Sequence, residues 1–273
     1  MKKKTDIGKI ILVLVLLAAG CAVCFPFLWM LLASFKTDLE IAQAVPTFFP
    51  ENPTLKNFRE LFSSMDFGMY LKNTLMITAY SYVGLLFNSM AGYAFAKYSF
   101  KGKNVLFAIV LATMMIPAQV TMIPMYMMMN VMGLTNTFTG IVLPSLAGAF
   151  AIFLFRQFIS TISDDFLEAG RIDGAGEIYI YLRIVLPLTK PILSLQIILT
   201  FINGWNAFLW PLIMASDEKY YTLSVGLSLL QNMYAQKFGL MMAGATVMII
   251  PVIIVYCLFQ KQIIKGISLS SYK

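Results

Sequence analysis

Histidine is absent from this chain of 273 residues. Because histidine is the commonest general base and metal ligand, its absence argues against the usual hydrolytic and metal-centred sites. The nucleotide-binding pattern Gly-x-x-x-x-Gly-Lys-Ser/Thr is missing too, since neither Gly8-Lys9 nor Gly102-Lys103 has the earlier glycine. We therefore expect no catalytic residue, no metal, no cofactor and no ATP site in this chain.

Charge is also scarce. Only 12% of the residues are charged and 59% are hydrophobic, with a mean hydropathy of +0.79. Stretches without any Asp, Glu, Lys or Arg lie at 10–35, 73–96, 104–155, 191–216 and 238–260. A spanning helix needs about 20 residues, and the stretch 104–155 is long enough for two spans around a turn at Gly133 and Asn136.

These stretches predict an all-α polytopic membrane protein with a single transmembrane domain over residues 1–273. We expect six transmembrane helices and one long loop at 160–190, the helices lying at about 10–34, 72–96, 105–129, 138–157, 191–215 and 238–260.

The distribution of lysine and arginine predicts the orientation. On the side that holds the N-terminus lie fourteen of these residues, and on the other side six, whereas acidic residues divide six to seven. Because cytoplasmic loops carry the excess of basic residues, we expect both termini and the loop 160–190 in the cytoplasm. The net charge of +7 then reflects topology, and nucleic acid is not an expected partner.

Two of the cysteines lie in patterns that are also found in lipoprotein signals and in redox motifs. Cys21 follows Ala18-Ala-Gly in a pattern typical of a lipoprotein signal, but the chain stays apolar through Ala33, so we expect an uncut helix. Cys21 and Cys24 are spaced as in redox motifs, yet no βαβ pattern surrounds them. We expect both, and Cys257, to be buried as small apolar residues.

A charged amphipathic segment, Glu168–Pro187, interrupts this apolar sequence. Asp165 with Glu168 three residues later is typical of a capping box, and Phe166, Leu167 and Ile172 predict the apolar side of a short helix. Because charge is costly in lipid, the segment must lie in water or against protein.

A second short helix is predicted after a bend at Gly174 and Gly176. Its apolar face is expected at Ile178, Leu182 and Val185. From these residues alone, two interpretations remain open: a compact knob that docks another protein, or an amphipathic loop on the membrane surface.

The spacing of this segment resembles the EAA loop of binding-protein-dependent ABC importer permeases. That loop runs Glu-Ala-Ala, three residues, Gly, nine residues, Ile-x-Leu-Pro. This chain has Glu168-Ala169-Gly170, three residues, Gly174, nine residues, then Ile184-Val-Leu186-Pro187. Its single departure is Gly170, one small residue for another.

Further motifs narrow the resemblance to MalG-type carbohydrate permeases. They are Asp173-Gly-Ala, Tyr93-Ala-Phe-Ala, Phe100-Lys-Gly-Lys, Ile116-Pro-Ala-Gln-Val-Thr-Met-Ile-Pro and Trp205-Asn-Ala-Phe-Leu-Trp-Pro-Leu. The resemblance implies a second, MalF-like permease, two ABC ATPase subunits and an extracytoplasmic solute-binding protein as partners, in a bacterial or archaeal cytoplasmic membrane. It also implies that Glu168 pairs with a basic residue of the ATPase and that Gly174 provides the bend.

Candidate substrate contacts come from the fifth predicted span, where Asn203, Trp205 and Asn206 suit sugar hydroxyls and ring faces. Interhelical hydrogen bonding is the alternative role for such residues. Asn88 and Gln119 are weaker candidates of the same kind. The functional alternatives are a secondary transporter, a permease for a non-sugar solute and a membrane scaffold without transport activity.

Overall fold

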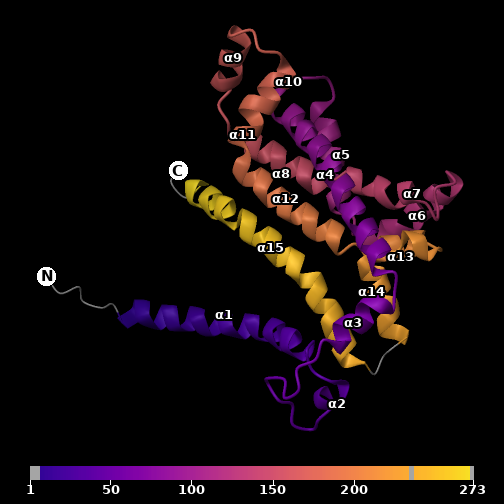
Figure 1. Cartoon of the computed structure of the whole chain (residues 1–273). Helices are drawn as coiled ribbons and strands as arrows, with labels where there is room; N and C mark the ends of the chain where they lie inside the picture. Colours follow the sequence, from indigo (N-terminus) through magenta and orange to yellow (C-terminus); the bar gives the residue numbers. More distant parts are fainter. Residues whose placement is uncertain (1–6, 234–236, 271–273) are drawn as a thin grey trace. The chain divides into compact units, whose positions relative to one another are not determined.

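The computed structural model describes residues 7–233 and 237–270, with the side chains of residues 7, 232, 233 and 262–270 left out. The lysines at positions 2 to 4, which contribute to the predicted orientation, lie outside this part. The described chain is helical and contains no strand (Figure 1). Its elements are α1 Ile7–Ala33, α2 Asp38–Ile41, α3 Lys56–Ser63, α4 Phe67–Lys97, α5 Lys103–Met114, α6 Ala118–Val131, α7 Phe138–Val142, η1 Leu143–Leu146, α8 Ala149–Ile159, α9 Asp165–Ile172, α10 Glu177–Ile180, η2 Tyr181–Val185, α11 Leu186–Leu188, α12 Lys190–Trp205, α13 Leu209–Met214, η3 Glu218–Tyr220, α14 Leu223–Met233 and α15 Phe238–Ser270.

By length and apolar composition, four segments of the described residues can cross a membrane: Gly8–Ala33, Phe138–Ile159, Lys190–Met214 and Phe238–Lys261. A fifth is present if the bent pair α5 and α6 counts as one span. Helix α4 has 31 residues but is not among them, because asparagine, serine and threonine lower its hydropathy. The fold is therefore that of a polytopic membrane protein, and the count of six spans stays a prediction.

Three predicted spans are divided into shorter helices in the structure. The region 105–129 forms α5 and α6, which meet at 106° around Pro117. Proline has no backbone N–H and disfavours helical geometry at the residue before it, so the bend follows from its position. The region 138–157 is interrupted at η1 and Gly148, and the region 191–215 between Trp205 and Leu209.

Helix α1 is exposed from Gly8 to Leu28, and only Ala33 at its end is buried. Cys21, Cys24 and Cys257 are exposed free thiols, so the prediction that they are buried was wrong. The physical reason is that a helix facing lipid needs no protein neighbour, and small apolar residues then lie on its surface.

The chain forms two compact units, one of residues 1–67 with 227–250, the other of 68–226 with 251–273. In the first unit, α3 supplies Leu61 to a core that also contains Leu230, Leu240 and Ala243. Buried Asn57 donates from Nδ2 to the carbonyls of Ser34, at 2.9 Å, and Lys36, at 2.7 Å. These bonds satisfy backbone acceptors after α1 ends.

A buried ion pair lies in the same unit. The Nζ atom of Lys36 is 3.9 Å from Oε1 of Glu40, and both side chains are almost fully buried. Lys36 also donates to Thr47 and lies over the ring of Trp29 at 5.0 Å. A buried charge is tolerated when it is paired and hydrogen-bonded in this way.

The second unit has two cores. One contains Leu85 and Tyr93 of α4, Phe155 and Ile159 of α8, and buried residues of the segment 165–192. The other gathers Ile77, Met129, Ile141, Val142, Met214 and Ala215 from α4, α6, α7 and the end of α13. Figure 1 shows α9 and α10 at the end of this unit where α4 ends and α5 begins.

Helix α4 pairs the hydroxyls of three of its buried residues with its own backbone. Thr74, Thr78 and Ser81 each donate to the carbonyl four residues earlier, at 2.8 to 2.9 Å. Gly84 allows the backbone at Ser145 and Leu146 to approach closely, because a Cβ there would lie 2.7 Å from the Leu146 Cα. Small residues permit such close helix contacts in membranes.

Candidate functional site

The segment 163–188 lies beside the end of α4. Its first helix, α9, has Asp164 at the N-cap position with no side-chain cap, so the prediction of a capping box at Asp165 was wrong. Asp164 instead accepts a hydrogen bond from Lys97 Nζ at 2.6 Å. Lys97 is almost completely buried and Asp164 is exposed, and this pair joins the start of α9 to the end of α4.

The bend after α9 is a Schellman motif. The N–H of Ala175 donates to the carbonyl of Gly170 at 2.9 Å, and that of Gly174 to the carbonyl of Arg171 at 3.0 Å. Gly174 has φ +79°, in the left-handed region that disfavours a side chain. Space is not the constraint, because no atom lies within 4 Å of a Cβ built there.

Of the face predicted for the second half of the segment, Val185 is buried, but Ile178 and Leu182 are not. Ile180 and Val185 are fully buried and Tyr181 nearly so, whereas Ile178 and Leu182 are exposed. Residues 181–185 form a π-helical turn, in which Leu186 N–H donates to the carbonyl of Tyr181. The buried face is the one that meets α4 and α8.

The packing around Gly170 explains why glycine replaces the second alanine of the EAA pattern. Gly170 is buried, and a Cβ there would lie 2.9 Å from Cδ1 of half-buried Ile184 and 3.2 Å from Cγ1 of Ile180. Leu186 is half-buried and Pro187 exposed. Glycine therefore lets α9 lie against the isoleucines of the second half.

Polar bonds brace the bend. Arg171 donates to the Glu177 carboxylate from Nε at 2.7 Å and from Nη2 at 3.3 Å, and the Tyr98 hydroxyl donates to the same carboxylate. These bonds, first from Arg171 and then from Tyr98, lower the pKa of Glu177. Lys97 likewise lowers the pKa of Asp164. Both carboxylates are charged at neutral pH; the Glu177 pair spans the bend, and the Asp164 pair joins α9 to α4.

The outer surface of this segment combines carboxylates with apolar side chains. Glu168, Ala169 and Asp173 are exposed, and no side-chain hydrogen bond or ion pair of Glu168 occurs among the described residues. The exposed apolar residues are Phe166, Ile172, Ile178, Tyr179 and Leu182. Phe166 and Ile172 were predicted to share an apolar side with Leu167, but only Leu167 is buried. Exposed apolar side chains of this kind are typical of protein contact sites when they form a contiguous patch.

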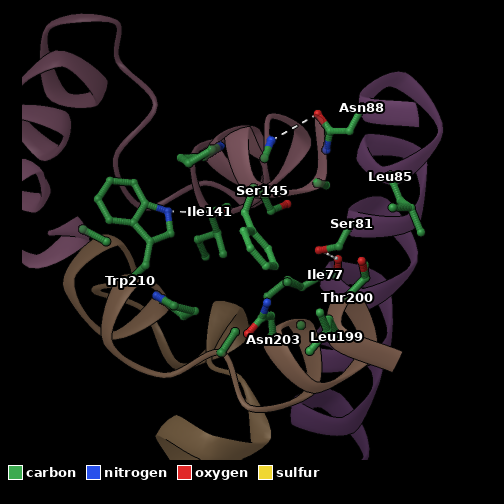
Figure 2. A pocket seen from close by; sticks show the side chains of 18 of the residues that line it. Ile77, Ser81, Leu85, Asn88, Ile141, Ser145, Leu199, Thr200, Asn203 and Trp210 are labelled. Carbon is green, nitrogen blue, oxygen red and sulfur yellow. Dashed lines mark hydrogen bonds between the residues drawn. The ribbon is translucent and has the colours of Figure 1, made fainter. Parts of the chain in front are cut away.

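A pocket of about 630 Å³ lies elsewhere in the second unit. Figure 2 shows Ser81, Leu85 and Asn88 of α4 on one side and Trp210 of α13 on the opposite side. Asn88 Oδ1 accepts from Gly148 N–H at 3.1 Å, and Trp210 Nε1 donates to the carbonyls of Gly140 and Ile141. The wall between them comes from η1 and α12.

The predicted substrate residues separate in the structure. Asn203 lines the pocket, whereas Trp205 is buried against Phe201, with ring centroids 5.7 Å apart, and Asn206 is exposed after the end of α12. Neither Trp205 nor Asn206 lines the pocket. Of the weaker candidates, Asn88 lines it and Gln119 does not.

Gln196, Thr200 and Trp210 also line the pocket, and sequence reasoning did not single them out as substrate contacts. A signal for Gln196 was present, because it is the only amide between Pro191 and Ile202 in a predicted span. Polar groups at membrane depth are costly and are often functional.

Comparison with known proteins places this geometry in a family. Residues 84–269, more than half of the chain, match the family model described as "Binding-protein-dependent transport system inner membrane component". The chain belongs to this family. The resemblance inferred from the EAA spacing is thereby confirmed. The matched residues include the whole segment 163–188 and most residues that line the pocket of the permease.

Individual relatives match the permease over nearly its whole length. It is 37% identical over 255 residues to the arabinooligosaccharides transport system permease protein AraQ of Halalkalibacterium halodurans, which covers 91% of each chain. It is 32% identical to the sn-glycerol-3-phosphate transport system permease protein UgpE of Yersinia pestis, with 90% of each covered. A solved bacterial ABC transporter involved in importing the acidic polysaccharide alginate matches with a TM-score of 0.82 and 26% identity, over 96% of this chain and 98% of that one.

Proposed function

We propose that this permease is the pore-forming subunit of an ATP-driven importer that passes sugars or related carbohydrates from a solute-binding protein into the cell. A second, MalF-like permease completes the pore, and two ABC ATPase subunits supply the energy. The family description and the names of relatives such as the arabinooligosaccharide permease support this assignment. A non-sugar solute is the alternative cargo, because one relative is named for sn-glycerol-3-phosphate.

The observation that carries the proposal is the construction of the segment 163–188, which we name the coupling knob. Its inner face is part of a core shared with α4 and α8, and its outer face presents Glu168 beside exposed apolar side chains. An amphipathic loop lying on a membrane would have no such core beneath it. A rigid element of this kind can transmit the closure of an ATPase pair as a displacement.

The proposed topology has six spans, with both termini and the coupling knob on the cytoplasmic face of a bacterial or archaeal membrane. Helix α4 supplies the second span, since its 31 residues extend about 46 Å and exceed the apolar thickness of a bilayer. The bent pair α5 and α6 supplies the third span. The excess of basic residues on one side supports the orientation.

The test compares two glycines of the coupling knob. Gly174→Asp places a side chain at φ +79°, whereas Gly176→Asp adds the same charge at an exposed position with φ −70°. We expect the first variant to abolish ATP-dependent uptake with normal membrane insertion, and the second to retain uptake. Glu168→Lys is expected to behave like Gly174→Asp because it reverses the charge offered to the ATPase.

Normal uptake by a well-expressed Gly174→Asp variant would contradict the docking role. Uptake by this chain alone in vesicles without ATP would instead support a secondary transporter. The readouts are radiolabelled uptake, and copurification of the ATPase subunits with the permease.

A further inference from the structure

The pocket between α4, η1 and α12 is mostly apolar, with several uncharged polar side chains on its walls. No Asp, Glu, Lys or Arg is among the residues that line it. The polar side chains on its walls are Ser81, Asn88, Ser145, Gln196, Thr200 and Asn203. Its volume of about 630 Å³ lies in the range of small-molecule sites.

Several of these polar groups already make hydrogen bonds within the protein. Ser81 donates to the Ile77 carbonyl at 2.9 Å, and Ser145 donates to the Val142 carbonyl at 2.7 Å. Asn88 Oδ1 is occupied by the N–H of Gly148. These bonds already use the hydroxyl hydrogens of Ser81 and Ser145 and the side-chain oxygen of Asn88.

Gln196 is different. Its side chain is buried, it lines the pocket, and its Nε2 atom has no hydrogen-bond partner among the described residues. An amide nitrogen offers two donors, and leaving them unpaired in a buried place destabilises the fold. A group of this kind in a native structure calls for a functional explanation, and a hydroxyl-rich ligand in the pocket would satisfy it.

The remaining lining suits a sugar ring. Trp210, Phe150 and Phe208 contribute aromatic surface to the walls. Aromatic rings bind the apolar faces of sugars, while amides and hydroxyls pair with sugar hydroxyls. A carboxylate or phosphate would enter a low-dielectric site without a cation beside it, at a large desolvation cost.

We propose that Gln196 contacts the cargo within this permease, in a site that accepts a neutral saccharide and disfavours an anionic one. This inference rests on the proposed import function and deepens it. It distinguishes the cargo of this chain from the glycerol phosphate and acidic polysaccharide named for two of its relatives.

The first experiment uses the complete transporter with its solute-binding protein in proteoliposomes. The probes are neutral di- and trisaccharides of arabinose, galactose and glucose, their uronate counterparts, and sn-glycerol 3-phosphate. We expect every transported compound to be neutral. ATP-dependent uptake of a uronate or a phosphate would overturn the inference while leaving the import function intact. Uptake of none of these compounds would count against the proposed import function itself.

The second experiment tests Gln196 with a matched control. Gln196→Leu removes both donors and Gln196→Glu replaces the amide with a charge, whereas Gln119→Leu changes an exposed glutamine of α6 outside the pocket. We expect both Gln196 variants to lower saccharide uptake about tenfold or more. Stimulation of ATP hydrolysis by the loaded binding protein is expected to stay within about twofold of the unmodified transporter, because the coupling knob is untouched.

Uptake by Gln196→Leu equal to that of Gln119→Leu would overturn the role of Gln196. A third measurement does not depend on how the variants fold. In the unmodified transporter, a diazirine derivative of a transported saccharide is expected to label peptides of α4, α12 or α13 of this chain. Labelling confined to the partner permease would overturn a site in this subunit.

Discussion

The coupling knob and the pocket are built in opposite ways. The knob is one continuous segment of 26 residues, 163–188, with charged groups on its surface and a core beneath. The pocket takes its residues from α4, α6, α7, η1, α8, α12 and α13, far apart in the sequence, and none of them is charged. The difference shows why spacing identifies the knob, whereas only packing identifies the pocket.

A cavity in the core beneath the coupling knob is expected to have the largest effect on stability. Ile180→Ala removes a fully buried side chain and is expected to lower the free energy of unfolding by about 2–5 kcal/mol. Its neighbour Ile178 is 74% exposed, so Ile178→Ala is expected to leave stability unchanged and to weaken ATPase copurification. The unfolding temperature and the amount of copurified ATPase distinguish the two variants. Equal unfolding temperatures for Ile180→Ala and Ile178→Ala would contradict the burial of Ile180.

The second-largest effect on stability is expected when an added side-chain atom overpacks the contact between α4 and η1. Gly84→Ala would place a Cβ 2.7 Å from the backbone of Leu146, which cannot move like a side-chain tip. We expect a loss of about 1–3 kcal/mol and reduced uptake. Gly20→Ala in α1 is the control, since no atom lies within 4 Å of its Cβ. Equal thermal stability of the two variants would show that α4 and η1 are not in close contact.

Breaking the brace of the knob is expected to have a smaller effect. Arg171→Gln removes the two hydrogen bonds to Glu177, both partners being exposed. Exposed ion pairs contribute little to global stability, so the melting temperature is expected to stay constant. Faster hydrogen exchange at residues 174–178 is the expected signature, and unchanged exchange there would exclude a bracing role.

The pH dependence of the knob is expected to be the smallest effect. Glu177 and Asp164 have pKa values lowered from their ordinary 4.5 and 3.8 by Arg171 and Lys97 respectively. A carboxylate whose pKa is lowered in the folded state stabilises it above the ordinary pKa, and this contribution is lost as pH falls through the lowered value. Exchange in the knob, corrected for intrinsic rates, is therefore expected to be constant from pH 8 to pH 6. A transition within that range would point to another group.

Much of the knob could be predicted because its geometry is local. The bend at Gly174 follows from a backbone conformation that glycine adopts at low cost, and its place after an eight-residue helix is visible in the sequence. The N-cap and the buried face of the second half could not be predicted. Lys97 takes Asp164 as a partner across 67 residues, and the position of α8 decides that Ile180 is buried while Ile178 is not.

The pocket could be predicted only in part. Asn203 and Asn88 stand out as amides in apolar stretches, and both line it. Trp205 and Asn206 have similar chemistry but lie outside it, because α12 ends at Trp205 and the chain changes direction before α13. Gln196 is also an amide in an apolar stretch, but only packing places its Nε2, which has no partner among the described residues, inside the pocket.

The sequence by itself determined the membrane class, the apolar stretches, the bend at Gly174 and the family, because composition, local backbone preference and motif spacing are properties of contiguous residues. Only the tertiary structure decided which faces are buried, where the proline at position 117 turns the chain, and which uncharged polar groups share one pocket. Those outcomes depend on packing between helices that are distant in the sequence, and no local pattern encodes such packing.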